Sequence, residues 1–320
     1  MLKTIVIVLA IILAGVGIYV LIKKREARKL ARMAEASCPP QGDFVTISTG
    51  RLHYVEAGSG PSVIFVHGLG GQLRSLSMTL LKPLSERYRV VFIDRPGMGW
   101  SERPESASAR IDDQAGYVEE VIDALDLGPT IVVGHSLGGA IASALALRAP
   151  GKVAGLALLA PLLRPSSMQP TSFGALGVTK PGVRRFIAHT FAGPTSVRNQ
   201  DVVRDEIFGP DPVPKAYTTL GGGLLSLRPK SFINTSRDYC AVPEVIGAQW
   251  KHYDEITCPV RVLYGTEDRI LNWREQGVEM SERFRHFKLK TVEGAGHMLP
   301  LTKVDEVVAL IDEVAGAAKA

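Results

Sequence analysis

The segment Gly134–Gly138, with the sequence GHSLG, places Ser136 between two glycines. The β-branched run Thr130–Val133 before it is typical of a buried parallel strand, and the Ala- and Leu-rich sequence from Ala140 to Pro150 predicts a helix. So sharp a turn leaves no room for Cβ atoms at its glycines and holds the serine in a strained conformation. That geometry exposes the hydroxyl beside the positive end of the helix, where a developing oxyanion is stabilised. The pattern therefore predicts that Ser136 is a nucleophile.

A nucleophilic serine needs a histidine to take its proton and a carboxylate to orient that histidine and stabilise its charged form. Two predicted strands near the C-terminus, Val260–Tyr264 and His286–Val292, are followed by Asp268 and by His297 respectively. Because the carboxyl ends of parallel strands meet at one edge of a sheet, we expect both side chains to lie beside Ser136. Glycines on both sides of the histidine let its loop reach into a cleft.

Ester hydrolysis at a serine also needs two backbone N–H groups that point at the oxyanion. One is expected from Leu137, the residue after the nucleophile. The other is expected from the segment His67–Gly71, HGLGG, which follows the predicted buried strand Ser62–Val66. Leu69 is our choice for this donor and Gly70 is the alternative. The glycines let a substrate carbonyl approach the backbone closely.

The rest of the sequence predicts the elements that must position these residues. Apolar spacing and turn residues predict, in chain order, a hairpin over Thr46–Glu56, a strand over Arg89–Ile93, a helix over Ile111–Leu125, a strand over Val153–Ala160 and a helix over Val304–Ala317. Strands that alternate with helices indicate a mostly parallel sheet flanked by helices. Asp94, Asp112 and Asp113 are expected to be loop and helix-cap residues and not catalytic.

The segments HGLGG, DRPGMGWS and GHSLGG, in this order and after these strands, resemble the α/β-hydrolase fold. The resemblance extends from about Phe44 to the C-terminus, apart from a poorly matched middle. It implies the chain order serine, acid, histidine, which Ser136, Asp268 and His297 obey. It also favours Asp268 over the neighbouring Glu267 as the acid, because Asp268 matches the G-x-x-D turn of the family.

In that family the middle of the chain carries a cap over the active site. We therefore expect residues 161–250 to form a mostly helical lid of short pieces. Seven apolar side chains of this segment are candidates either to line an acyl pocket or to pack the cap on the core: Phe173, Phe186, Phe191, Tyr217, Leu220, Leu224 and Leu225. His189 and His252 are expected to be structural.

Charge and cysteine content bear on the class of function. The chain of 320 residues has a formal net charge of +5, and six of its basic residues lie between Lys23 and Arg32, so the rest is near neutral. A nucleic-acid-binding protein would spread basic residues over its fold, so no nucleic-acid partner is expected. The three cysteines lack metal-ligand spacing, so no metal site is expected, and a Cys240–Cys258 disulfide stays open.

The N-terminal segment predicts a membrane anchor. Thr4–Ile22 contains no charged residue, and a helix of this length nearly matches the roughly 30 Å thickness of a bilayer's hydrocarbon core. The alternative, a signal peptide, has a shorter apolar core and a cleavage site directly after it, whereas KKREARKLAR follows here. Lys3 alone stands against six basic residues on the other side, which places the following domain in the cytoplasm.

These patterns divide the chain into five segments. Residues 1–24 are the transmembrane anchor with its first basic residues, and residues 25–43 are a basic stem and linker. Residues 44–160 and 251–320 are the two parts of the hydrolase core, and residues 161–250 are the cap inserted between them.

The resemblance implies a membrane-anchored serine hydrolase that cleaves carboxylic esters through an acyl-enzyme, without a metal or an organic cofactor. The chain is similar to monoacylglycerol-lipase-like hydrolases with an N-terminal anchor, which favours a lipid-like small-molecule ester as the substrate. A carbon–carbon bond hydrolase of ring-cleavage products, with the same triad, is the alternative. Epoxide hydrolases and dehalogenases of this fold use an aspartate nucleophile, which Ser136 argues against. A non-catalytic scaffold would be expected to have lost a triad member, and the oligomeric state stays open.

Overall fold

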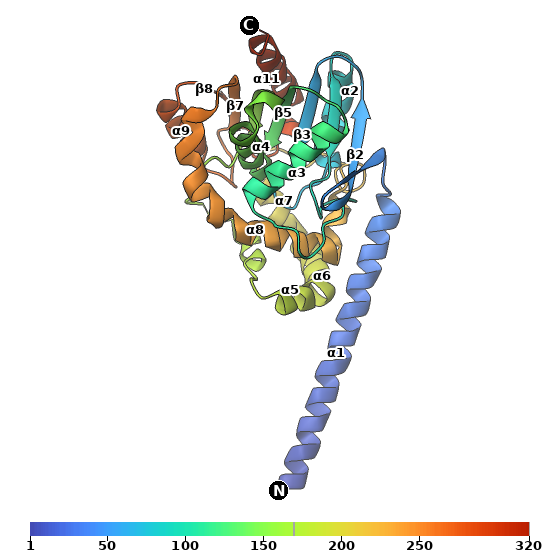
Figure 1. Ribbon diagram of the computed structural model, residues 1–320. Helices are drawn as coiled ribbons and strands as arrows, with labels where there is room; N and C mark the ends of the chain where they lie inside the picture. Colours follow the sequence, from blue (N-terminus) through green and yellow to red (C-terminus); the bar gives the residue numbers. More distant parts are fainter. Residues whose placement is uncertain (169, 320) are drawn as a thin grey trace.

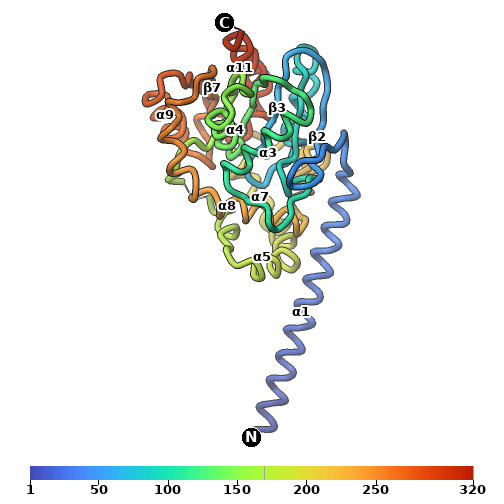
Figure 2. The backbone as a smooth tube through the Cα atoms, in the orientation of Figure 1, coloured from blue at the N-terminus to red at the C-terminus, as the bar shows by residue number. Residues whose placement is uncertain are grey.

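The computed structural model describes residues 1–168 and 170–319 and consists of an α/β domain from which one long helix extends (Figure 1). This helix, α1 (Leu2–Ser37), carries the N-terminus at its free end. The C-terminus lies at the opposite end of the molecule (Figure 2). Only the C-terminal part of α1 therefore lies beside the domain.

An eight-stranded sheet forms the centre of the domain, in the order β1-β2-β4-β3-β5-β6-β7-β8. The first two strands form an antiparallel hairpin, β2 is antiparallel to β4, and the remaining neighbours are parallel. The strands are β1 (Asp43–Ile47), β2 (Gly50–Ala57), β3 (Ser62–Val66), β4 (Arg89–Ile93), β5 (Thr130–His135), β6 (Val153–Leu159), β7 (Val260–Gly265) and β8 (Phe287–Val292). Both β3 and β5 are buried along their whole length, as expected for central parallel strands.

Helices cover both faces of the sheet (Figure 1). On one face α3 (Ile111–Ala124) packs on α4 (Leu137–Arg148), and on the other α2 (Arg74–Ser85) packs on α11 (Val304–Ala317). Shorter elements complete the core: η1 (Pro150–Lys152), η5 (Trp250–Glu255), η6 (Arg274–Val278), α9 (Glu279–Arg283) and α10 (Leu299–Thr302).

The predicted α/β-hydrolase architecture is confirmed. The strands predicted at Ser62–Val66 and Arg89–Ile93 and the helix predicted at Val304–Ala317 agree with the structure residue for residue. One helix start is wrong, because α4 begins at Leu137 and not at Ala140. The helix starts directly after Ser136, so Gly138, which the sequence assigns to the turn, belongs to the first turn of the helix.

The cap, residues 161–250, is mostly helical as expected. Its elements are η2 (Thr171–Leu176), α5 (Pro181–Ile187), η3 (Ala188–Ala192), α6 (Gly193–Arg198), α7 (Gln200–Phe208), η4 (Gly223–Leu227) and α8 (Pro229–Gln249). The expectation of short pieces is wrong for α8, which has 21 residues. Its buried residues include Asn234, Ser236 and Asp238, whose polar side chains hide the apolar periodicity that would otherwise predict a helix.

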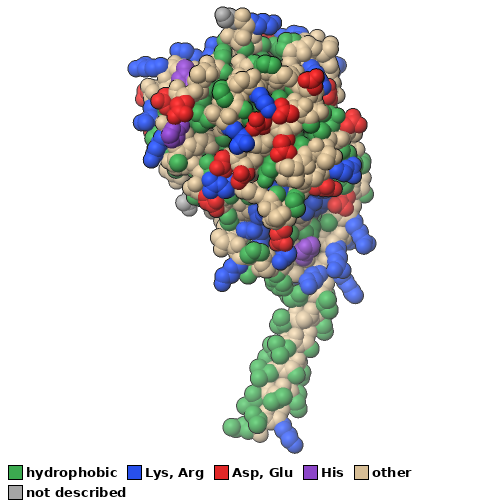
Figure 3. Space-filling view, viewed as in Figure 1, with side chains coloured by type: hydrophobic (Ala, Val, Ile, Leu, Met, Phe, Trp, Pro, Cys, Tyr) green, Lys and Arg blue, Asp and Glu red, His purple; other side chains and the backbone are tan. Residues whose placement is uncertain are grey.

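The N-terminal helix is longer than the predicted anchor, because the expected stem continues it to Ser37 without a break. Among the described residues, α1 is the one helix long and apolar enough to cross a membrane, a test that signal sequences also pass. Hydrophobic side chains cover its protruding part, and Lys and Arg side chains gather where it meets the domain (Figure 3). After the helix, the carbonyl of Cys38 accepts a hydrogen bond from Trp100 Nε1 at 3.1 Å, so the core holds the end of the stem.

Candidate active site

Ser136 lies on the turn between β5 and α4, and its backbone is strained. Its φ of 55° and ψ of −120° lie in a region that residues with a Cβ rarely adopt. Its N–H donates to Leu159 O at 3.0 Å, and its C=O accepts from Gly139 N–H at 2.8 Å. Strand β6 and helix α4 therefore hold the strained serine at the carboxyl edge of the sheet.

Two glycines make this turn possible. A Cβ at Gly134 would lie 2.5 Å from Gly138 O, and a Cβ at Gly138 would lie 2.0 Å from Val66 O. Both neighbours are backbone atoms, and Val66 O belongs to the central strand β3, so neither can move away cheaply. The structure agrees with the tight turn that the sequence predicts.

Asp268 and His297 are hydrogen-bonded partners in the loops after β7 and β8. His297 Nδ1 lies 2.7 Å from Asp268 Oδ2, and both side chains are buried. The second carboxylate oxygen, Oδ1, accepts the N–H groups of Ile270 and Leu271 at 2.8 and 2.9 Å. The alternative acid, Glu267, is exposed. With Nδ1–H donated to the carboxylate, Nε2 of His297 is left as the proton acceptor.

Ser136 and His297 line the same cavity, which has a volume of about 100 Å³. Within the described part of the chain, no hydrogen bond joins Ser136 Oγ to His297 Nε2. In ligand-free hydrolases this bond is often long and tightens when substrate binds. The two side chains are far apart in the sequence, but both line this cavity.

Of the two expected oxyanion donors, one lies in the loop after β3 and the other is at the start of α4. Leu69 lines the catalytic cavity, as do the adjoining glycines. Leu137 is buried and is the first residue of α4, where an N–H has no partner within its own helix. A Cβ at Gly68 would lie 2.9 Å from Ser136 Cβ, so the glycine there lets the two loops touch.

Residues 61–304 match the family described as the alpha/beta hydrolase fold. The chain belongs to this family. The matched range takes in both glycine-rich loops, the cap and the three residues Ser136, Asp268 and His297. Family membership supports hydrolase activity and leaves the substrate open.

Two curated relatives match over only part of their own length. The chain is 38% identical over 120 residues to the dihydrolipoyllysine-residue acetyltransferase component of the acetoin cleaving system of Cupriavidus necator, which covers 37% of this chain and 32% of that protein. It is 35% identical over 120 residues to haloalkane dehalogenase 2 of Mycobacterium tuberculosis, covering 38% of this chain and 42% of that one. The chain thus spans less than half the length of these two relatives.

A solved structure matches over the whole chain. The crystal structure of a membrane phospholipase A, described as a bacterial virulence factor, superimposes with a TM-score of 0.69 and 21% sequence identity. The alignment covers 99% of this chain and 100% of that one. At this identity the likeness shows the shared fold, with its N-terminal segment included in the aligned length.

His135 contacts His297 and was not among the residues predicted to be functional. Its Nε2 donates to His297 O at 3.1 Å, and the two rings lie 4.9 Å apart at 50°. Burial, with the neighbouring His297 and His67, lowers the pKa of His135 to about 3, so the ring is neutral. The elbow motif accepts any residue before the serine, so no sequence signal marks this contact.

Asp211, from the cap, holds the loop of His297 and was also missed. Its carboxylate accepts the N–H of Gly296 at 2.8 Å and pairs with Lys303 Nζ at 3.0 Å. The residue stands between two prolines in the poorly matched middle of the chain. Nothing in that context distinguishes it from an ordinary loop aspartate, so only the tertiary contact reveals its role in positioning.

The cap contributes part of the cavity wall. Phe173, Ile207 and Tyr217 line the catalytic cavity. A second cavity of about 30 Å³ shares Tyr217 and three residues of the core with the first and extends to Leu225 of η4. The two cavities therefore share part of their walls, and both are lined by cap and core residues.

Four of the seven pocket candidates in the cap are not in either cavity. Phe186 and Leu220 are exposed, Leu224 is half-buried without lining a cavity, and the ring of Phe191 lies 6.3 Å from that of Tyr19 on α1. Of the two roles considered for them, these four do not line the pocket, because an apolar residue in the cap can face the site, the core, α1 or solvent. Both His189 and His252 are exposed.

A buried network joins the oxyanion loop to the cap. Arg95 donates to the carbonyls of His67 and Gly68, each at 2.9 Å, and to Asp238 of α8 at 2.9 Å. Arg103 donates to the other oxygen of Asp238 at 2.6 Å. Burial, followed by the charge of Arg95, lowers the pKa of His67 to about 3, so this histidine is neutral. Cap and core are thus held together directly behind the glycine-rich loop.

The three aspartates predicted to be non-catalytic lie in a loop and in the first turn of a helix. Asp94, in the loop after β4, is buried and binds His53 Nδ1 at 2.7 Å and two backbone N–H groups at 2.7 and 2.8 Å. Burial alone would raise the pKa of Asp94, but its hydrogen bonds, with His53 first, lower it below its usual value. Asp112 and Asp113 lie in the first turn of α3.

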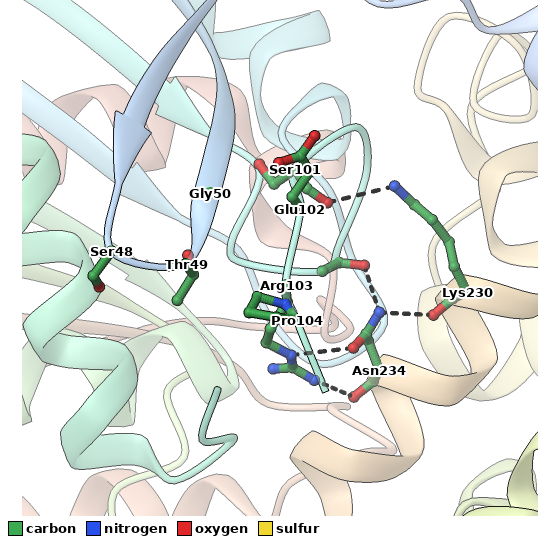
Figure 4. A pocket seen from close by; sticks show the side chains of 10 residues that line it. Ser48, Thr49, Gly50, Ser101, Glu102, Arg103, Pro104, Lys230 and Asn234 are labelled. Carbon is green, nitrogen blue, oxygen red and sulfur yellow. Dashed lines mark hydrogen bonds between the residues drawn. The ribbon is translucent and has the colours of Figure 1, made fainter. Parts of the chain in front are cut away.

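A hollow larger than the cavity of Ser136 lies elsewhere on the surface. A groove of about 590 Å³ lies between the hairpin, the loop after Asp94 and α8 (Figure 4), and it shares no lining residue with the cavity of Ser136. Two of its polar side chains bind backbone carbonyls of residues that line it: Lys230 Nζ donates to Ser101 O at 3.4 Å, and Asn234 Nδ2 donates to Gly97 O at 3.0 Å. The groove is therefore a seam between core and cap.

Over residues 1–168 and 170–319 no cluster of metal-ligating side chains occurs, and all three cysteines are free thiols.

Proposed function

We propose that this protein is a membrane-anchored serine hydrolase that cleaves carboxylic esters with a lipid-like acyl group. One observation carries the proposal: Ser136 and His297 line a common cavity, and Asp268 binds the opposite nitrogen of the histidine ring. Membership of the alpha/beta hydrolase family supports the hydrolase class.

The proposed reaction proceeds through an acyl-enzyme. His297 Nε2 takes the proton of Ser136 while Oγ attacks the ester carbonyl, and Asp268 stabilises the imidazolium. The N–H groups of Leu69 and Leu137 bind the oxyanion, and His297 then gives its proton to the leaving alcohol. Water, deprotonated by the same histidine, attacks the acyl-enzyme and releases the acid.

The lining of the cavity favours an uncharged, apolar substrate. Within the described residues no lysine or arginine lines the catalytic cavity, whereas Phe173, Ile207 and Met298 do. A carbon–carbon hydrolase of ring-cleavage products must hold an acidic substrate, which this lining does not favour. A dehalogenase mechanism would need a carboxylate at the position of Ser136.

Anchoring is part of this proposal. The exposed apolar surface of α1 before Lys23 supports a membrane span, and a lipid-like ester would be available in the same membrane. The basic residues between Lys23 and Arg32 support a cytoplasmic position for the hydrolase domain, which is part of the proposal.

A fluorophosphonate probe tests the serine hydrolase directly. The full chain in detergent should be labelled at Ser136, and Ser136→Ala should not be labelled although it unfolds at the same temperature. If the folded native chain resists the probe, the proposal fails. p-Nitrophenyl esters of increasing chain length, assayed beside a vinylogous diketone acid, then define the substrate class. Hydrolysis of the acid but not of the esters would favour the carbon–carbon hydrolase.

A further inference from the structure

Exposed apolar side chains are distributed unevenly over this molecule. Apart from α1, the large hydrophobic side chains that are exposed all belong to the cap: Val183, Phe186, Val197, Val202 and Leu220. The described part of the hydrolase core has none. Three of them, with exposures of 47%, 45% and 41%, lie on the neighbouring elements α5 and α6: Val183, Phe186 and Val197. Apolar side chains that are exposed together in one region indicate a surface that a membrane or another protein covers.

The same part of the cap carries only positive charge. Residues 161–200 contain five Lys and Arg residues and no Asp or Glu. Of these, Arg185 on α5 and Arg198 on α6 are exposed. Arg185 pairs with Glu105 at 3.2 Å, but both side chains are more than half exposed, so the pair is weak. Apolar side chains between basic ones are the composition of helices that lie at a membrane surface.

The position of α1 shows where a membrane would lie. The uncharged segment Thr4–Ile22 ends near Tyr19, whose ring lies 6.3 Å from that of Phe191 in η3. Phe191 in turn lies 5.9 Å from Phe186 in α5. Lys23 follows and lies over the Tyr19 ring at 5.9 Å. Aromatic and basic residues at the end of an apolar span mark the boundary between hydrocarbon and head groups.

The cap elements α5 and α6 therefore lie beside α1 at the level of this boundary. Helix α1 packs against both η3 and α6, and in Figure 1 α5 and α6 form the end of the domain from which α1 protrudes. A bilayer that surrounds Thr4–Ile22 has its surface against the same end.

We propose that the outer face of α5 and α6, formed by Val183, Arg185, Phe186, Val197 and Arg198 and here named the cap face, rests on the anionic head-group layer of the membrane. The inference depends on the membrane anchoring in the proposed function. The apolar side chains enter the boundary between head groups and acyl chains, and the two arginines bind lipid phosphates. A second copy of the chain is the other possible occupant, and it does not explain the absence of acidic residues.

The cap face is connected to the catalytic cavity. Arg184, on the buried side of α5, donates from Nε to Val178 O and to Ser236 Oγ of α8, each at 2.9 Å. Val178 follows η2, which carries the cavity residue Phe173. Contact between lipid and the cap face would therefore also hold η2, which supplies Phe173 to the wall of the cavity. We expect the shape of the cavity to depend on the lipid surface.

Fluorescence quenching by lipids tests the contact. The full chain carrying Phe186→Trp is reconstituted in phosphatidylcholine vesicles with or without phosphatidylglycerol, and the emission of the native chain is subtracted. With brominated acyl chains, the added tryptophan should shift to shorter wavelength and lose intensity, more so with phosphatidylglycerol and less so in high salt. The matched control is Glu282→Trp on α9, an exposed helix that Figures 1 and 2 place on the other side of the domain from α1. Its emission should not change.

Three results separate the possibilities. If the tryptophans introduced by Phe186→Trp and Glu282→Trp respond equally weakly while the chain floats with the vesicles, the cap face does not contact lipid and the inference is wrong. A blue shift in Phe186→Trp that rises with protein concentration and resists brominated lipid shows contact with a second copy, which also overturns it. A chain that does not float with vesicles lacks the anchor, and this outcome removes the inference together with the anchoring, while probe labelling of Ser136 still tests the chemistry.

Activity gives a second measurement. The double variant Val183→Asp and Phe186→Asp should hydrolyse a vesicle-embedded ester at least about tenfold more slowly, because two charges replace two apolar side chains that lipid covers. Hydrolysis of water-soluble p-nitrophenyl acetate should stay unchanged, since neither residue lines the cavity. An equal loss on both substrates would mean that the cap itself is damaged, and an unchanged rate on vesicles contradicts the proposal.

Discussion

The core and the cap differ in what their apolar side chains face. In the core, strands β3 and β5 are buried over their whole length, and the described residues of the core include no large exposed hydrophobic side chain. In the cap, helices such as α5 have apolar side chains in solvent, while α8 buries the polar residues Asn234, Ser236 and Asp238. The core follows the simple rule of apolar inside and polar outside. The side chains of the cap contact the core, the cavity of Ser136 and α1, so no single rule of burial describes them.

This difference separates two tasks. The core strands deliver Ser136, Asp268 and His297 to one edge of the sheet, where parallel strands end. The cap supplies Phe173 and Tyr217 to the cavity wall. We therefore expect changes in the core loops to abolish the chemistry, whereas changes in the cap alter stability and substrate access.

The largest effect is expected for the acid. Asp268→Asn should lower kcat on a soluble p-nitrophenyl ester by about 10³- to 10⁴-fold, because an amide no longer fixes the tautomer of His297 or stabilises its charged form. The matched control is Glu267→Gln, which changes the exposed neighbour and should leave kcat unaltered. Steady-state kinetics decide between them, and a greater loss in Glu267→Gln would reverse the assignment.

The contact between cap and core is expected to be the next most sensitive. Asp238→Asn leaves Arg95 and Arg103 buried with their shared carboxylate gone, since the side chains of all three residues are 0% exposed. Breaking such a network should cost about 3–5 kcal/mol of unfolding free energy. The control on the same helix is Glu244→Gln, whose pair with Arg110 is exposed. Urea unfolding of the full chain measures both, and equal midpoints would show that the buried network is not stabilising.

The smallest effect concerns acid. His67 and His135 have a pKa of about 3 in the folded protein, against about 6.5 for an unfolded histidine. Between these values the unfolded chain binds more protons, so the unfolding free energy rises with pH and is lost as pH falls below about 6.5. His135→Gln should reduce the slope by up to about 1.4 kcal/mol per pH unit near pH 5.

The exposed cap histidine provides the comparison for this titration. His189→Gln is the matched control, because this histidine lies in the cap and its side chain is exposed to solvent. Unfolding midpoints in urea between pH 4 and pH 7 give the slopes. If the cap variant altered the slope as much as His135→Gln, the acid sensitivity would not arise from the buried core histidines.

Much of the core could be predicted from the sequence, because each of its signals is local. A β-branched run such as Ser62–Val66 is buried on both faces wherever it is placed in a parallel sheet, so composition alone marks it as a strand. The glycines at 134 and 138 are required by contacts with backbone atoms a few residues away or in the neighbouring strand. The pairing of Asp268 with His297 followed from the order of strands and loops.

The cap and the surroundings of the triad depend on contacts between distant parts of the chain. Asp211 binds the backbone beside His297 although 85 residues separate it from Gly296. His135 meets His297 because the loop after β8 reaches the end of β5, and Phe191 meets Tyr19 because α1 lies against the cap. An apolar or acidic residue in an irregular segment has the same local sequence signal whichever partner it has. The sequence by itself thus determined the fold and the elbow through short-range geometry. It also named three candidate catalytic residues, with the acid chosen through its likeness to the G-x-x-D turn of the family. Only the tertiary structure decided which cap residues face the cavity, the core or α1, because that choice depends on the packing of the whole chain.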